Sequence, residues 1–324
     1  MVFLAFIWLI LSAVTAACYN IFLKKSPEKL LLSFWVAVFT FVGMTIVFYE
    51  SKLISGASLE AITKNFGVMA IENIYNYLLV GGIVVLGIAL KAYLFHHYSL
   101  AKIIPILEIG TPLTALLYFF LGNHLTFQET LSIGLISAGA FVSGFERFHF
   151  PNIFKPLLRL PFYLYVGALT MALLDTSENL IVYLTTEANE TTHKVVHFFH
   201  THGITFFTKE FITSLEYFQV SSLFFVVIFL LYLMVAAKKK PHAIMKELYT
   251  QKTGIFYASV ANFLSQYLYY YVYQNNDQAV VVALTKFSVP LTLAFAYLTL
   301  KEEIHAPEIV GVVLILVGGC IGAL

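Results

Sequence analysis

The chain has 324 residues, of which 60% are hydrophobic and 11% are charged, and its mean hydropathy is +0.83. Soluble domains are much less apolar, so the composition predicts an integral membrane protein, and the formal net charge of +1 argues against a nucleic-acid surface. The two cysteines, Cys18 and Cys320, each lie inside an apolar run and indicate neither a disulfide framework nor a metal site.

Apolar runs of spanning length follow one another along the whole chain. A helix that crosses a bilayer needs about 20 mostly apolar residues. By this criterion the sequence predicts ten spanning helices, at residues 1–23, 30–49, 77–95, 99–122, 130–145, 161–184, 213–237, 253–273, 277–300 and 307–324. The first run is expected to be a retained helix rather than a signal peptide, because Lys24 and Lys25 follow it instead of preceding it.

Lysine and arginine are distributed unevenly between the two sides that alternate loops would face. The loops of one side hold most of them, whereas the other side has only Lys52, Lys64, Lys194 and Lys209. Since positively charged loops stay in the cytoplasm, both termini are expected outside. We expect the protein in a bacterial inner membrane.

The segment at residues 278–319 has a weaker copy in the first half of the chain. Superimposing Pro112 on Pro290 aligns Glu108 with Lys286, and a shift of one residue aligns the later glycines Gly139 and Gly318. A duplication divides ten helices into units 1–160 and 161–324, and an odd number of helices per unit forces opposite insertion. The predicted fold is therefore an all-α membrane protein with two inverted five-helix repeats and a substrate site between them.

Both copies contain an Ala-rich start, a mid-helix Pro-Leu-Thr and a later Leu-Ile with a glycine three residues on. This order resembles the ten-helix, EamA-type members of the drug/metabolite transporter superfamily. Asn123 and Ser132 depart from the pattern in the first half. The resemblance implies a transporter of that fold, not an enzyme, and no cofactor. It rests on Ala279, Pro290, Leu291, Leu300, Glu302, Gly311, Leu314, Ile315 and Gly318, and on Ala101, Pro112, Leu113, Leu121, Gly122, Leu125, Thr126, Leu135, Ile136 and Gly139.

Six charged residues lie inside the predicted spans. Each costs about 3 kcal/mol at mid-bilayer on insertion scales, which makes it a candidate site residue. Glu108 and Lys286 each precede a proline by four residues, so each lies beside a carbonyl that the proline leaves without a hydrogen bond, at an expected kink. They are predicted to bind substrate as a pair; a buried ion pair that fixes helix register is the alternative. The six are Lys91, Lys102, Glu108, Asp175, Glu178 and Lys286.

Asp175 and Glu178 share one face of the sixth predicted helix with Asn179. Two neighbouring carboxylates raise one another's affinity for protons, as a proton-coupled carrier requires. They are therefore candidate coupling residues, with Lys91 and Lys102 as candidates for an anionic group. A partly hydrated helix end is the alternative for the acidic pair.

The eighth predicted helix carries Asn262 and Gln266 on one face, followed by a run of tyrosines that includes Tyr270. These residues, with Tyr19 of the first helix, are candidate substrate-binding residues, because aromatic rings attract alkylammonium groups. An interfacial aromatic belt, or polar groups that only pack helices, would give the same pattern.

A loop between the sixth and seventh predicted helices contains His193, His197 and His200 at helical spacing. This spacing suits a transition metal or an amphipathic interfacial segment, and we assign no metal site to it.

The expected function is secondary active transport of a small polar metabolite by alternating access, as an exchanger or with protons as the coupling ion. Export of organic cations or amino-acid derivatives is the alternative within transport. A non-transporting scaffold or a lipid-modifying enzyme is the alternative of another class, and neither would have a continuous polar cavity. The expected partners are a small-molecule substrate and the lipid bilayer, with no nucleic acid, for a monomer or homodimer.

Overall fold

The computed structural model describes residues 2–107, 110–121, 126–143, 162–186, 189–202, 212–276, 281 and 284–323, and these residues form helices joined by short turns, with no strand among them. This confirms the all-α prediction for the part of the chain that is described. Each of the ten predicted apolar runs contains described helical residues.

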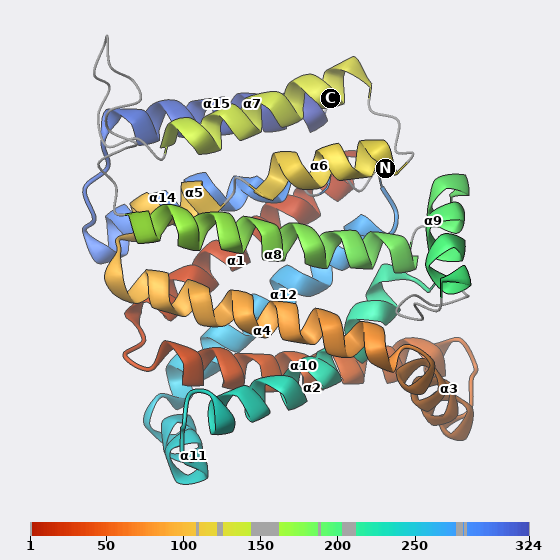
Figure 1. Ribbon diagram of the computed structural model, residues 1–324. Helices are drawn as coiled ribbons and strands as arrows, with labels where there is room; N and C mark the ends of the chain where they lie inside the picture. The colour runs from red at the N-terminus through yellow and green to blue at the C-terminus, as the bar shows by residue number, and fades with distance from the viewer. Residues whose placement is uncertain are drawn as a thin grey trace.

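Long helices and shorter helical segments lie side by side across the molecule, seen horizontally in Figure 1. In the first half they are α1 (Val2–Lys25), α2 (Lys29–Ile54), α4 (Ile74–His97), α5 (Leu100–Leu107), α6 (Gly110–Phe120) and α7 (Phe127–Ser143). In the second half they are α8 (Phe162–Thr186), α10 (Ser214–Val235), α12 (Lys252–Tyr273), the 3₁₀ turn η2 (Thr285–Phe287), α14 (Ser288–Leu300) and α15 (Ala306–Ala323).

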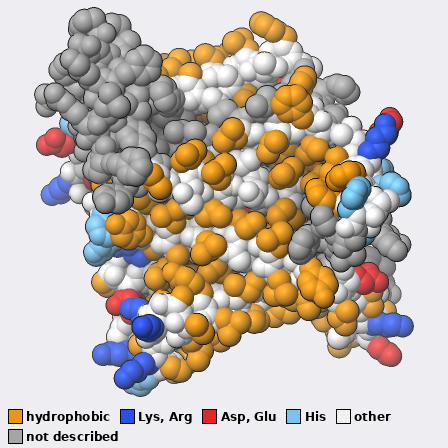
Figure 2. Space-filling view, in the orientation of Figure 1, with side chains coloured by type: hydrophobic (Ala, Val, Ile, Leu, Met, Phe, Trp, Pro, Cys, Tyr) orange, Lys and Arg blue, Asp and Glu red, His pale blue; other side chains and the backbone are white. Residues whose placement is uncertain are grey.

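The chain is a multi-pass integral membrane protein. Four described helices are long and apolar enough to cross a bilayer, at Phe6–Lys25, Lys29–Ile54, Ile74–His97 and Ser214–Val235, and α14 and most of α15 are shorter apolar helices. Figure 2 shows hydrophobic side chains over the middle of one face and charged or histidine side chains at its two ends. A band of exposed apolar side chains between two polar rims is what a bilayer requires of a protein surface.

Shorter helices lie in the loops between the spanning helices: α3 (Leu59–Glu72), α9 (Glu190–Thr201), which contains the histidines at helical spacing, and α11 (Pro241–Thr250). Residues at the start of each short helix favour helix formation. The Ser58 hydroxyl accepts from the Ala61 N–H, Asn189 and Thr192 form a capping box, and Pro241 occupies the first turn of α11.

The expected kink at Pro290 implied one continuous but bent α-helix along the ninth predicted run. The structure instead has a 3₁₀ turn followed by an α-helix. Lys286 lies in the 3₁₀ turn η2, and a separate α-helix begins at Ser288. Pro290 therefore occupies the first turn of α14, where its missing N–H costs no helical hydrogen bond. The kink expected at Pro112 falls next to residues 108 and 109, which lie outside the described residues.

The helix contacts repeat when the two halves are exchanged. If α1, α2, α3, α4 and α7 are matched with α8, α10, α11, α12 and α15, the pair α1–α12 corresponds to α8–α4, and α2–α12 corresponds to α10–α4. The pairs α2–α10 and α7–α15 correspond to themselves. Even the short helices follow the pattern, since α11 contacts α2 and α3 contacts α10.

Helices α7 and α15 pack on each other through small residues and lie together at the top of Figure 1. A Cβ on Gly318 would come within 2.9 Å of both the Leu135 Cβ and the Ser132 carbonyl oxygen, and the Ser132 hydroxyl donates to the Gly318 carbonyl at 2.7 Å. A Cβ on Gly139 would meet the Gly311 carbonyl oxygen at 2.5 Å. Close backbone approach through small residues is the usual way that membrane helices associate.

The hairpin between α4 and α5 is held by two charged residues from distant parts of the chain. The Lys24 ammonium donates to the carbonyls of Phe95 at 2.7 Å and Tyr98 at 2.5 Å, at the end of α4. The Glu302 carboxylate accepts from the Leu100 N–H at 3.2 Å, at the start of α5. Both charges complement the helix ends that they cap.

Candidate functional site

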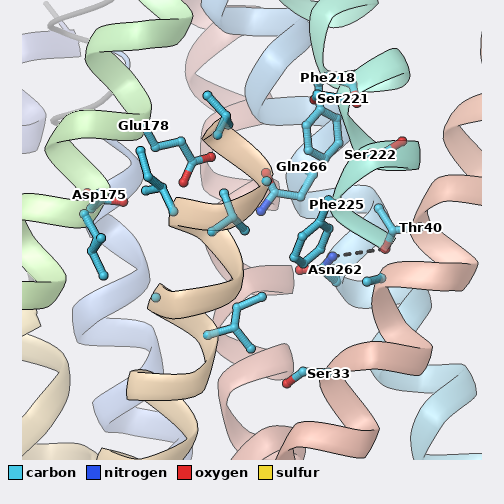
Figure 3. A pocket seen from close by; sticks show the side chains of 18 of the residues that line it. Ser33, Thr40, Asp175, Glu178, Phe218, Ser221, Ser222, Phe225, Asn262 and Gln266 are labelled. Atoms are coloured by element: carbon cyan, nitrogen blue, oxygen red, sulfur yellow. Dashed lines mark hydrogen bonds between the residues drawn. The ribbon is translucent and has the colours of Figure 1, made fainter. Parts of the chain in front are cut away.

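A central cavity of about 240 Å³ lies between helices of both halves, with walls from α1, α2, α4, α8, α10 and α12. Figure 3 shows Asp175 and Glu178 on one side of it, and Asn262 bonded to Thr40 on the other. Seven of the candidate residues from the sequence line it: Tyr19, Lys91, Asp175, Glu178, Asn262, Gln266 and Tyr270.

A second cavity, of about 220 Å³, lies beside the first and has walls from α1, α8, α12, η2 and α14. Asp175, Glu178, Gln266 and Tyr270 line both cavities. The acidic pair therefore stands at the boundary between the two cavities, near the middle of α8 rather than at its end.

Helix α8 positions the two carboxylates by its own periodicity, since residues three apart share a face. A Cβ on Gly110 would lie 3.5 Å from an Asp175 carboxylate oxygen, so this carboxylate lies close to the start of α6. The Asn179 side chain donates to the Asp175 carbonyl at 2.8 Å and accepts from the Tyr269 hydroxyl at 3.4 Å. The acidic face is thus joined to α12 through a tyrosine.

The opposite wall is formed by α2 and α12. The Asn262 amide donates to the Thr40 hydroxyl at 3.0 Å, and this bond joins the two helices at the cavity. Nearer the start of α2, the hydroxyls of Tyr19 and Ser33 lie 3.4 Å apart. The Lys91 ammonium lies 5.7 Å from the centre of the Tyr19 ring and 5.4 Å from that of Phe95, within the range of cation–π attraction.

A cluster of buried tyrosines lies where α6, α8 and α12 end and α4 and α10 begin. Tyr118 stacks on Tyr183 with ring centroids 4.3 Å apart, and the hydroxyls of Tyr118 and Tyr273 lie 2.9 Å apart. The Tyr217 hydroxyl donates to the Asn76 amide oxygen at 2.5 Å. Tyr270 and Tyr273 are 5% and 1% exposed, so these two do not form the interfacial belt that was the alternative for the tyrosine run.

Three candidate residues cannot be placed beside the cavity. Glu108 and the side chains of Lys102 and Lys286 lie outside the described residues. The backbone of Lys286 belongs to η2, whose Thr285 lines the second cavity. The predicted pairing of Glu108 with Lys286 stays a prediction.

Some cavity residues were missed because they are uncharged. Thr40 and Ser33 lie on α2, and Ser221 and Ser222 lie on α10 beside Phe218. Each is a small polar residue inside an apolar run, which is the signal that could have found them. Within the described ranges, α9 included, no group of three His, Cys, Asp or Glu lies close enough together to hold a metal ion.

Residues 200–321 match the EamA-like transporter family. The match confirms the family resemblance over the helices α10 to α15, and it implies a membrane transporter of the drug/metabolite transporter kind. No curated protein matches the chain significantly.

The EamA-like segment supplies one side of the central cavity, including Phe218, Asn262, Gln266 and Tyr270. Tyr19, Lys91, Asp175 and Glu178 come from the part of the chain before it. Both acidic residues thus lie outside the matched segment but face it across the cavity.

Proposed function

We propose that this protein is a secondary active transporter that moves a small polar metabolite across its membrane by alternating access. The observation that supports this most is a cavity in which polar and ionisable side chains lie among mainly apolar ones, inside an integral membrane protein with an EamA-like segment. Polar and ionisable side chains within the bilayer are costly and are kept where they line a substrate or ion pathway. A scaffold would have no use for such a cavity, and a family of transporters argues against a lipid-modifying enzyme.

The alternating movement would take place between two inverted five-helix units, residues 1–160 and 161–324. The exchange symmetry of the helix contacts supports this proposal, because inverted repeats give two related conformations with opposite openings. The cavity has walls from both units, α1, α2 and α4 from one and α8, α10 and α12 from the other. In this proposal the buried tyrosine cluster closes one end of the pathway.

Asp175 and Glu178 would bind the coupling proton or a cationic group of the substrate. Their place at the boundary of both cavities supports this role, since a proton bound there could be exchanged with either space. Gln266 and Tyr270 line the same boundary and would bind the polar groups of the substrate. Lys91, near Tyr19, would attract an anionic group.

Export of organic cations or amino-acid derivatives is a second candidate. It is favoured by the aromatic rings beside the carboxylates, since Phe218 and Tyr270 stack with centroids 4.4 Å apart at the cavity wall. A quaternary ammonium group would bind between such rings and the acids. The ammonium of Lys91 in the same cavity weighs against a substrate that carries only positive charge.

Counterflow in proteoliposomes tests the proposal. Purified protein is reconstituted and loaded in turn with members of a panel of metabolites, amino-acid derivatives and quaternary amines, with and without a pH gradient. We expect accelerated exchange of at least one small polar compound. Glu178→Gln should reduce it about tenfold or more, because a hydrogen bond to a charged group contributes about 1.5 to 3 kcal/mol.

The matched control is Glu60→Gln, which neutralises an exposed carboxylate on α3, outside the cavity. It should leave the exchange rate unchanged. Exchange of quaternary amines alone would favour the second candidate, and no exchange across the panel would contradict both.

A further inference from the structure

An apolar groove of about 390 Å³ lies along the outside of the α2–α12 pair. Much of its lining is exposed, as expected of a surface that faces lipid rather than the protein interior. The exposed side chains that form its walls are Phe39, Val42 and Ile46 of α2 and Phe256 and Val260 of α12.

The groove is as long as one leaflet of a bilayer. Its α12 wall runs from Lys252, the first residue of the helix, to Phe263, which at 1.5 Å per residue is about 16 Å. The hydrocarbon core of a bilayer is about 30 Å thick, so this is about half of it. A groove of this length would reach from the membrane surface to near the midplane if α12 begins at the surface.

Its surface end is positively charged. The exposed Lys252 lies at the start of α12, where the first N–H groups have no acceptor within the helix. The N-cap residue Gln251 provides no side-chain hydrogen bond to them, and the space beside Gly254 is open. A lysine together with a helix N-terminus attracts a phosphate group.

Among the described residues, Ser259 is the one polar side chain besides Lys252 that lines the groove. Ser259 is 5% exposed, and its hydroxyl oxygen has no hydrogen-bond partner among the described residues. A buried hydroxyl without a partner is unfavourable, so Ser259 indicates that a ligand supplies an acceptor. Ser259 follows Gly254 by about 7.5 Å along the helix axis, and its side chain leans back towards the helix start. Below a phosphate at that start, this is where the ester groups of a glycerolipid would lie.

We propose that the groove binds an anionic phospholipid. The phosphate lies at Lys252 and the N-terminus of α12, an ester carbonyl accepts from the Ser259 hydroxyl, and one acyl chain follows the groove to Phe263. The three observations are independent of one another, since they concern the length, the charge and the unpaired hydroxyl of the groove.

The bound lipid would lie directly behind the wall of the central cavity. Thr40 and Asn262, which line the cavity, join α2 and α12 by a hydrogen bond, while the adjacent Phe39 and Phe263 line the groove. On Gly43 a Cβ would come within 2.9 Å of the Phe263 ring, so the seam between groove and cavity is tightly packed. The lipid thus supports a wall of the transport cavity without entering it.

Native mass spectrometry of the full-length protein in detergent tests the proposal, with phosphatidylglycerol or phosphatidylcholine added at equal concentration. We expect one phosphatidylglycerol to be retained about fivefold more than phosphatidylcholine. This ratio corresponds to the electrostatic attraction of one lysine near a membrane surface for an anionic lipid. Lys252→Gln should remove this preference. The matched control, Lys240→Gln, alters an exposed lysine on the same side that does not line the groove and should keep it.

A second pair of variants tests the apolar part. Val42→Trp fills the groove and should abolish retention of both lipids, whereas Val227→Trp, at a similarly exposed valine of α10, should not. Thermal unfolding of each variant shows whether it is folded, and Lys252→Gln tests the site even if Val42→Trp is unstable. Equal retention of the two lipids by the wild type would overturn the proposal. So would a dimer that Val42→Trp dissociates while no lipid is retained, since a second copy would then occupy the groove.

Discussion

Glu247 of α11 is a buried carboxyl outside the spanning helices, 8% exposed and hydrogen-bonded by the Gln251 amide. Burial, and then the negative charge of Glu28, raise its pKa above the ordinary value of 4.5. Between 4.5 and the raised pKa the folded state binds more protons than the unfolded state, so stability falls as pH rises through this window. The docking of α11 should therefore be strongest at mildly acidic pH.

Hydrogen exchange measures this effect. Protection factors of the α11 amides, which correct for the intrinsic exchange rate, should be higher at pH 5 than at pH 7. Glu247→Gln should flatten the difference, because the amide keeps an acceptor for Gln251 but does not ionise. An unchanged pH dependence in this variant would contradict the assignment.

The sequence predicted which single residues belong to the candidate site where those residues are charged. Asp175, Glu178 and Lys91 stand out because ionisable groups inside a span are costly, and the structure places them on one cavity. Thr40 and Ser221 carry a weaker signal, a hydroxyl inside an apolar run, and they share it with Thr170, which only bonds the Val166 carbonyl of its own helix. Only the tertiary structure decides which serine or threonine faces a cavity.

At the scale of helices, the closest packing is that of α7 on α15. Gly318→Ala would bring a Cβ within 2.9 Å of the Ser132 carbonyl oxygen, which belongs to backbone and cannot rotate away. Overpacking of this kind costs about 1 to 3 kcal/mol. We expect a corresponding loss of stability on unfolding of the micelle-solubilised protein in denaturing detergent.

Gly134→Ala is the matched control on α7, because no atom lies within 4 Å of its Cβ position. It should be neutral or stabilise by up to about 1 kcal/mol through helix propensity. If both variants unfolded alike, close contact at Gly318 would not be what holds α7 against α15.

The spanning helices were predictable because their signal is composition over about 20 residues. The short helices α3 and α11 were not, and α9 was indicated only by the spacing of its histidines, since such helices depend on local starts such as the Ser58 cap or Pro241 and on the surface that the long helices offer. At Pro290 the interruption expected from the proline takes the form of the 3₁₀ turn η2, directly before the first turn of α14.

At the scale of the whole molecule, the sequence predicts a duplication mainly from the last two helices of each half. The helix contacts extend the correspondence to α3 and α11, whose sequences share no pattern. This is expected, since helices on the lipid-facing outside need only be apolar or amphipathic, whereas the glycines at the α7–α15 contact are fixed by close approach. Opposite insertion of the halves, however, concerns the membrane and stays a prediction.

Cysteine accessibility tests that prediction at two corresponding turns. Ser55 follows α2, and Lys240 follows α10, its counterpart in the second half. In a background with Cys18→Ser and Cys320→Ser, the variants Ser55→Cys and Lys240→Cys are treated on intact cells with a maleimide that does not cross membranes. Both positions are exposed, so labelling reports only on the side of the membrane.

Inverted halves place these turns on opposite sides, because each follows the second spanning helix of its unit. The excess of lysine near Lys240 predicts that it is cytoplasmic and that Ser55 is outside. Ser55→Cys should thus be labelled on intact cells and Lys240→Cys only after permeabilisation. The reverse result would invert the predicted orientation of the protein but would still support inverted halves. Labelling of both positions from the same side would mean that the halves insert in parallel. Alternating access between inverted units would then have no basis.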